Sequence, residues 1–174
     1  LSSSSAASDV YKRQVERMSA VYALGRNPCP DAVSKLVSLL ESDDNAYVRR
    51  ATAWSLANYD NQIVLRPLIK ALQNDVSSVR LWASSSLAEI GSISNENAQL
   101  AADQLLISLK IDNEPVVRSN CIWSLCRLYQ KLSNKLQELF IDECTKIALF
   151  DSEHSVMEEA KTALDSMGMK GFYK

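Results

Sequence analysis

The amino-acid sequence predicts an all-α fold, a right-handed α-solenoid of antiparallel helix pairs with about five repeats, the first incomplete. A nine-residue phrase recurs three times, as VRRATAWSL at residues 48–56, VRLWASSSL at 79–87 and VRSNCIWSL at 117–125. Apolar residues with helical spacing precede each copy. A repeated amphipathic unit cannot bury its apolar face alone, so such units stack on their neighbours.

The leucine that closes the phrase sets the length of the repeat. Aligned on this leucine, five units end at residues 24, 56, 87, 125 and 164, with spacings of 32, 31, 38 and 39 residues. Two antiparallel helices with short turns fit the shorter spacing. We expect the extra residues of the later units in loops at residues 91–97 and 129–135.

The first helix of each pair shows its period directly. Apolar residues at positions i, i+3, i+4 and i+7 form one stripe in three units. These residues are Val33, Leu36, Val37 and Leu40; Leu65, Leu68, Ile69 and Leu72; and Ala102, Leu105, Leu106 and Leu109. A fourth such helix is expected near residues 135–150, where the pattern is poorer.

The second helix of each pair follows a polar turn and opens with Val-Arg. The turns, at residues 42–45, 74–78, 112–115 and 151–155, are rich in the Asp, Asn and Ser that cap helix N-termini. Small residues near the middle of this helix permit close packing on the first helix. They are Ala51, Ala83, Cys121 and Ala160.

The first fourteen residues differ from the rest in character. Residues 4–14 look like the translation of a sequencing adapter joined to an environmental gene fragment, and they lack the basic start and apolar stretch of a signal peptide. We therefore expect residues 1–14 to be a non-native tail, disordered or extending the first helix. Residues 15–174 then form a single domain, and the native gene would begin upstream.

Charge and composition exclude several functions. The net charge is −2, and residues 15–174 alone carry 17 basic and 20 acidic residues. This balance argues against a nucleic-acid partner, and no apolar run approaches the roughly 20 residues of a membrane span. The four cysteines lack metal-ligand spacing and His154 is the only histidine, so we expect no metal and reduced thiols, as in a cytoplasmic protein.

A family resemblance rests on two adjacent segments. Residues 64–75, with Pro67, followed by residues 79–91, resemble the HEAT-like repeat of the phycobilisome (phycobilin) lyase E/F type, with related segments at residues 17–25 and 160–164. The resemblance extends from residue 15 to about residue 168. The sequence differs from the family consensus at Ser55, Ser86 and Ser124, which stand where a second alanine is usual. It also lacks most of the glycines that close the consensus repeat.

The resemblance implies a HEAT-like solenoid and two classes of function. Proteins built on this repeat include cyanobacterial bilin lyases and chaperone-like bilin-handling proteins, and also adaptors that catalyse no reaction of their own. A repeat motif encodes stacking, so the function must be argued from the site. Neither a Ser-His-Asp set nor a Gly-rich phosphate loop is present in the sequence, so whether the chain is an enzyme stays open.

Candidate binding residues follow from the period of the second helix. The positions two and six residues after its valine point toward the inner curve of the solenoid. They hold Met18, Tyr22, Arg50, Trp54, Leu81, Ser85, Ser119 and Trp123. Exposed aromatic residues commonly mark partner or ligand sites. The alternative is that Trp54 and Trp123 are partly buried between repeats, and Trp82 is expected in core or inter-repeat packing.

The arginine after each valine has a structural interpretation. Arg49, Arg80 and Arg118, with Arg17 as a fourth, could bind phosphate or propionate groups. Each of the first three follows a turn aspartate, and a ladder of Asp–Arg pairs between adjacent units is the commoner role. The aspartates are Asp44, Asp75 and Asp112. Arg50, on the inner ridge, is the best candidate for gripping an anionic group.

Two functional hypotheses remain. In the first, the protein is a bilin lyase or bilin-delivery factor with no intrinsic cofactor, which holds an open-chain tetrapyrrole transiently against Tyr22, Trp54 and Trp123. It would present the bilin to a cysteine of a phycobiliprotein subunit, alone or with a partner lyase subunit, and act through orientation. In the second, the protein is a non-catalytic scaffold that recognises a protein or peptide through the same ridge.

Overall fold

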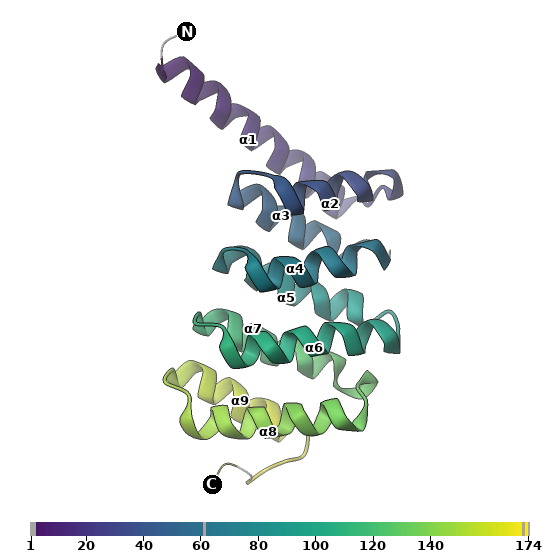
Figure 1. Cartoon of the computed structure of the whole chain (residues 1–174), viewed down its shortest axis with the longest axis vertical. Coiled ribbons are helices and arrows are strands. Elements are labelled where there is room, and N and C mark those ends of the chain that lie inside the picture. Colours follow the sequence, from purple (N-terminus) through teal and green to yellow (C-terminus); the bar gives the residue numbers. More distant parts are fainter. Residues whose placement is uncertain (1–2, 61, 172, 174) are drawn as a thin grey trace.

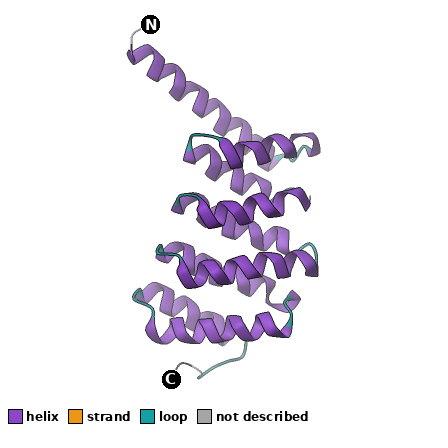
Figure 2. Ribbon diagram, in the orientation of Figure 1, coloured by secondary structure: helices purple, strands orange, loops and turns teal. Residues whose placement is uncertain are grey.

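The structure, a computed structural model, describes residues 3–60, 62–171 and 173, with side chains described from residue 11 onward. Within these residues the chain is helical throughout, with short connections and no strand (Figure 2). Helix α1 spans Ser3–Arg26 and is followed by four antiparallel pairs. The pairs are α2 (Val33–Ser42) with α3 (Ala46–Leu56), α4 (Leu65–Asn74) with α5 (Ser77–Gly91), α6 (Asn95–Ile111) with α7 (Pro115–Leu128), and α8 (Asn134–Phe150) with α9 (His154–Ser166).

The pairs stack in one direction, as Figure 1 shows, with the N-terminal part of α1 projecting beyond the stack. This arrangement is the expected α-solenoid, with one unpaired helix and four complete units. Short 3₁₀ turns at Pro30–Ala32, Gln62–Val64 and Tyr129–Lys131 lead into α2, α4 and α8. Since α1 begins at Ser3, the segment with the adapter-like sequence extends the first helix.

The helices form two rows. Helices α2, α4, α6 and α8 make the first-helix row, which faces the viewer in Figure 1, and α1, α3, α5, α7 and α9 make the second-helix row. Successive helices of the second row pack closely on one another, whereas successive helices of the first row are in looser contact. The stack therefore curves with the second-helix row on its inner side.

The core is a continuous seam between the rows. The valine and the leucine of each repeated phrase are fully buried, and so are the small residues Ala51, Ala83, Cys121 and Ala160. Because a small side chain lets two helix axes approach, these residues permit the second helix of each pair to pack closely in the seam. Polar side chains cap the helices, and Asn45 accepts hydrogen bonds from the N–H groups of Tyr47 and Val48.

Most of the extra residues of the later units lie in helices, which corrects the expected loop at residues 91–97, while residues 129–133 connect α7 to α8 close to where the second loop was expected. Helices α6 and α8 have 17 residues each, against 10 in α2 and α4. The expected loop at residues 91–97 shrinks to residues 92–94, since Gly91 ends α5 and Asn95 begins α6. Ser94 makes this short connection possible because its hydroxyl accepts the N–H of Asn97 and caps α6.

Candidate functional site: the inner face of the second-helix row

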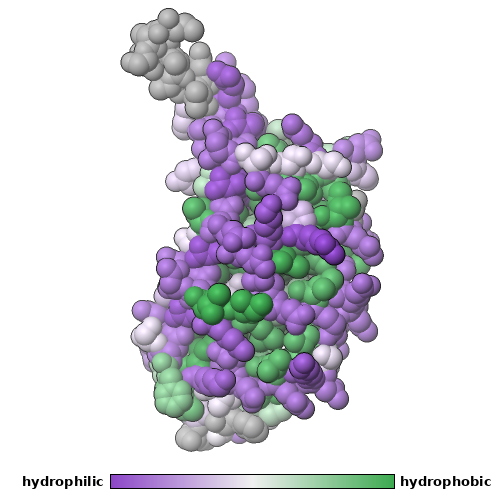
Figure 3. Space-filling model, in the orientation of Figure 1, coloured by the Kyte–Doolittle hydropathy of each residue, from purple (hydrophilic) through white to green (hydrophobic). Residues whose placement is uncertain are grey.

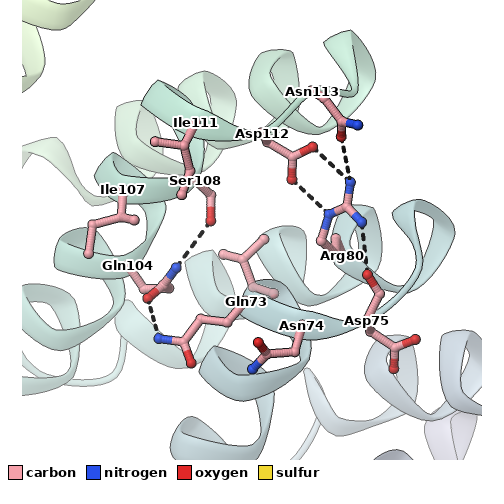
Figure 4. Close-up of a pocket in the computed structure, with 11 residues that line it drawn as sticks. Gln73, Asn74, Asp75, Arg80, Gln104, Ile107, Ser108, Ile111, Asp112 and Asn113 are labelled. Carbon is pink, nitrogen blue, oxygen red and sulfur yellow. Dashed lines mark hydrogen bonds and ion pairs between the residues drawn. The ribbon is translucent and has the colours of Figure 1, made fainter.

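The arginines after each valine form a ladder along one edge of the stack. Arg80 on α5 grips the carboxylate of Asp112 in the next unit, with Nε–Oδ2 at 2.7 Å and Nη2–Oδ1 at 2.8 Å (Figure 4). Its Nη1 donates to the carbonyl oxygen of Asp75 in its own unit at 2.8 Å. The same two-point geometry joins Arg17 to Asp43, Arg49 to Asp75, and Arg118 to Asp151.

This ladder differs in two members from the set named from the sequence. The first rung uses Asp43, while the side chain of Asp44 is 86% exposed and lies 3.4 Å from Arg17. Asp151 forms the last rung and was missed, because the fifth unit has Met157 where the others have arginine. The hydrogen bond to Asp112 raises the pKa of Arg80 despite the opposing effect of burial. The ladder arginines are thus engaged between units rather than free for a ligand.

A hollow opens on the inner face across three consecutive units. We call it the tryptophan hollow, and it has a volume of about 330 Å³. The residues that line it are Trp54 on α3, Ala57 and Asn58 just after α3, Trp82, Ser85, Ser86 and Glu89 on α5, and Trp123 on α7. Trp54, Ser85 and Trp123 occupy the same position of their repeats. The hollow exists because a serine interrupts a row of indoles.

Trp82 lines this hollow between units, so of its two expected places, core or inter-repeat packing, the core is excluded. Its side chain is 37% exposed, close to the 41% of Trp123, while Trp54 is half-buried. The equivalent residue of α3 is the buried Ala51, and an indole is too large for that space. The sequence interpretation thus placed two tryptophans at the site, where the structure gathers three.

Two charged residues at the rim were also missed. The guanidinium of Arg127 lies 5.0 Å from the centre of the Trp123 ring, and its Nη2 is 2.8 Å from Oε1 of Glu89. Both side chains are 44% exposed. Glu89 and Arg127 stand one helical turn beyond Ser85 and Trp123. The repeated phrase ends at its leucine, so extending the same spacing by four residues would have found them.

The remaining ridge residues line the approach to the hollow. Tyr22 packs on Trp54 with ring centres 5.5 Å apart. Arg50 lies one turn before Trp54 and places its guanidinium 5.3 Å from the centre of the Tyr47 ring. Met18, Leu81 and Ser119 are half-buried. Arg50 is therefore near the aromatic residues without lining the hollow itself.

A second surface lies on the first-helix row. A groove of about 520 Å³ runs between α4 and α6, with Ile107 and Ile111 on one side and Arg80 and Asp112 on the other (Figure 4). Gln73 donates to Oε1 of Gln104 at 2.7 Å and so bridges the two helices. Figure 3 shows apolar residues gathered over this row. The exposed apolar residues of α6 and α8 are Leu100, Ile107, Ile111, Leu139, Leu149 and Phe150.

Three of the four cysteines, Cys121, Cys126 and Cys144, are poor candidates for chemistry, while Cys29 is exposed. Burial raises the pKa of Cys126 to about 11, and the charge of Glu159 adds to this effect. Burial also raises the pKa values of Cys121 and Cys144. Thiols in such surroundings stay protonated and unreactive at neutral pH. Among the described residues, no group of His, Cys, Asp and Glu side chains could hold a metal ion, and no helix has the length and apolarity of a membrane span.

The family model for HEAT repeats matches two overlapping segments, residues 12–88 and 33–126. The chain belongs to the HEAT-repeat family. No curated protein matches it. A solved structure with a similar fold is a designed armadillo repeat protein in complex with the peptide (KR)4, with a TM-score of 0.57 and 24% sequence identity. The match covers 83% of this HEAT-repeat chain and 65%, just under two thirds, of the designed protein.

HEAT repeats form scaffolds typical of protein binding. In this HEAT-repeat chain the ladder arginines and the buried seam hold the units together, while the tryptophan hollow stays open. The stack therefore separates structural residues from residues that remain available to a partner.

Proposed function

We propose that the chain is a protein-binding scaffold that holds an extended segment of a partner along the inner face of the second-helix row. One side chain of that segment enters the tryptophan hollow. The observation that carries the proposal is the convergence of three partly exposed indoles from three units around Ser85. Tryptophans contribute much of the energy of protein interfaces, and the residues beside them need only exclude water.

The volume and polarity of the hollow suit a single side chain better than a large ligand. Small-molecule sites usually enclose about 300–1,000 Å³, and the hollow is at the lower end of that range. The polar side chains that line it include Ser85, Asn58 and Glu89, and the hydroxyl of Ser85 accepts a hydrogen bond from the amide of Asn120 at 2.7 Å. These polar groups can orient a peptide, while the indoles supply apolar contact.

Filling the hollow tests the proposal. Linear peptides of a displayed library are selected on the wild-type chain and measured again on a Ser85→Phe variant. The neighbouring units carry tryptophan at this position, so the fold accommodates an aromatic ring there. We expect selected peptides to lose about tenfold or more in affinity, the loss that follows from removing roughly 1.4 kcal/mol of contact.

A matched variant separates the hollow from the other apolar surface. Ile107→Phe enlarges a side chain in the α4/α6 groove and leaves the inner face unchanged. Thermal unfolding of both variants shows whether each remains folded. Selected peptides that bind Ser85→Phe as well as the wild type, or that are lost on Ile107→Phe instead, would place binding elsewhere and refute the proposal.

Bilin handling is a second candidate function. It rests on the sequence resemblance and on one observation, the pairing of Tyr22 with Trp54 beside the guanidinium of Arg50. A flat tetrapyrrole could lie on these rings with a propionate at Arg50. Arg50 does not line the tryptophan hollow, so its guanidinium and the three indoles do not form one site, and for this reason we rank bilin handling second.

An absorption spectrum distinguishes the candidates. The protein mixed with phycocyanobilin would give a red-shifted complex if it handles bilins. The complex would weaken in a Trp54→Ala/Trp123→Ala variant and persist in Ile107→Phe. An unaltered bilin spectrum at high protein concentration would exclude this candidate and leave the protein-binding function standing.

A further inference from the structure

The walls of the tryptophan hollow have the chemistry of a cation site. The face of an indole carries negative charge density and attracts ammonium and guanidinium groups, most strongly among the aromatic side chains. Three indoles surround this hollow, and Glu89 is the one charged residue among those that line it. The side chains of Asn58, Ser85 and Ser86 are neutral. Where Arg127 does not occupy Glu89, these surroundings thus favour a positive group over an apolar or an anionic one.

The protein already places a guanidinium at this point. Arg127 lies 5.0 Å from the centre of the Trp123 ring and contacts Glu89 at 2.8 Å. It stands beside the hollow, on α7, and is not among the residues that line it. Its position shows which two groups a cation meets here, an indole face and a carboxylate oxygen.

The ion pair between Arg127 and Glu89 is weak enough for another cation to take the place of Arg127. Both side chains are 44% exposed, and surface ion pairs of this kind contribute little to stability because water and salt screen them. The ladder arginine Arg80 differs, since its side chain is 16% exposed, Asp112 is 5% exposed, and two hydrogen bonds join them. A ligand cation could therefore replace Arg127 at Glu89 without disturbing the stack.

We infer that the tryptophan hollow takes an arginine or lysine side chain of the bound segment, which displaces Arg127 from Glu89 and lies between the indoles. This inference rests on the proposed protein-binding function and specifies its partner as a segment with a basic residue at the point of contact. Arg127 then acts as an internal competitor that lowers the affinity of the free site. The ligand gains a carboxylate contact and indole faces from three units.

The experiment compares two capped peptides of alternating glycine and either arginine or citrulline. Citrulline has nearly the shape of arginine and no charge. The indole N–H signals of the ¹⁵N-labelled full chain report binding at the hollow directly in a nuclear magnetic resonance titration. We expect the arginine peptide to shift these signals with an affinity about tenfold above that of the citrulline peptide.

Three variants test whether the preference for the arginine peptide depends on Glu89 and Arg127. Glu89→Gln should weaken the arginine peptide about tenfold, and Arg127→Gln should strengthen it about threefold because the competitor is gone. The matched control is Glu41→Gln, which removes the same charge from an ion pair with Lys70 on the first-helix row. It should change the affinity by less than about twofold, because screening limits distant charges.

The outcomes separate the inference from the function on which it rests. Equal binding of the citrulline peptide at the indoles would overturn the cation preference and support a hollow that takes neutral side chains. Equal losses in Glu89→Gln and Glu41→Gln would show general attraction to an acidic chain and also overturn it. If neither peptide shifts the indole signals, the inference fails, and the library selection on Ser85→Phe still decides the proposed function.

Discussion

Arg80 and Asp112 belong to successive units and meet in a two-point ion pair, with donor–acceptor distances of 2.7 and 2.8 Å. The pair is repeated along one edge of the stack, so each unit holds the turn of the next. Asp112 also accepts the N–H of Glu114 at 2.9 Å and shapes the turn that starts α7. One carboxylate thus joins two units and fixes the turn that leads into α7.

Removing the charge of Asp112 should destabilise the stack. In Asp112→Asn the amide oxygen can still accept the N–H of Glu114, but the guanidinium of Arg80 loses its counter-ion in a largely buried place. We expect the free energy of unfolding to fall by about 2–3 kcal/mol, somewhat less than for a fully buried pair. Urea unfolding followed by far-ultraviolet circular dichroism measures it.

Asp44→Asn is the control for this change, because Asp44 lies in an equivalent turn with its side chain 86% exposed. It should alter the free energy of unfolding by less than about 0.5 kcal/mol. Similar losses in the two variants would mean that the two-point geometry of the ladder carries no special energy.

The first rung predicts a dependence of stability on pH. Burial opposes ionisation of Asp43, but the hydrogen bond and charge of Arg17 and the N–H of Asn45 outweigh it, so the pKa of Asp43 falls below its ordinary 3.8. A carboxyl with a lowered pKa stabilises the fold fully above the unfolded value. This contribution is lost as the pH falls through the lower, folded pKa.

The comparison of wild type with Asp43→Asn isolates this effect, since the other carboxyls cancel in the difference. The difference in the free energy of unfolding should be constant from neutral pH to about pH 5 and shrink below the ordinary pKa of 3.8. A difference that grows as the pH falls would mean that the pKa of Asp43 is raised in the folded chain, opposite to the expected direction.

The sequence predicts the residues that the repeat period places, but not those that depend on details of a turn or a neighbouring unit. Arg49, Arg80 and Arg118 follow from the repeat period alone, because each stands directly after a buried valine, and Arg17 has the equivalent place in its unit after Glu16. The choice of Asp43 over Asp44 does not, since a shift of one residue in a turn decides which carboxylate faces the neighbouring unit. Helix boundaries differed for a related reason: Ser94 and its cap convert an expected loop into helix.

The tryptophan hollow shows a similar division. Periodicity placed Trp54 and Trp123 on one ridge, but it left Trp82 to core or inter-repeat packing. Side-chain volume excludes the core, because the equivalent space in α3 holds only the methyl group of the buried Ala51. The rim pair was missed because the repeated phrase stops before Glu89. Repeat position predicts which face a residue occupies, and neighbouring volumes decide how deeply it is buried.

Two serines at the same repeat position should respond in opposite ways to substitution by alanine. The Oγ of Ser86 donates to the carbonyl oxygen of Ala53 in the preceding unit at 2.8 Å. The Oγ of Ser55 is buried and, within the described part of the chain, has no hydrogen-bond partner. A buried hydroxyl without a partner costs free energy, whereas a bonded one contributes about 1 kcal/mol.

We therefore expect Ser86→Ala to lower the free energy of unfolding by about 1 kcal/mol. Ser55→Ala should leave it unchanged or raise it by up to about 1 kcal/mol. Chemical denaturation of both variants measures the contrast, and each serves as the control for the other. Equal destabilisation would show that packing of the small side chain, rather than its hydrogen bond, matters at this position.

Gly25 on α1 supports one wall of the tryptophan hollow. The residue is buried against the indole of Trp54, and a methyl group added at Gly25 would overlap that ring. In Gly25→Ala the ring must therefore move, which disturbs its contact with Tyr22 and the shape of the hollow. Alanine also favours the helix over glycine by about 1 kcal/mol, so stability alone cannot report the change.

Tryptophan fluorescence and near-ultraviolet circular dichroism in a Trp82→Phe/Trp123→Phe background follow Trp54 by itself. We expect Gly25→Ala to shift the emission of Trp54, and in the otherwise wild-type chain to weaken peptides that enter the hollow. Ser19→Ala on the exposed face of the same helix is the control and should change neither property. An unchanged Trp54 signal with full peptide binding would mean that the ring has room to keep its place, and that α1 does not shape the site.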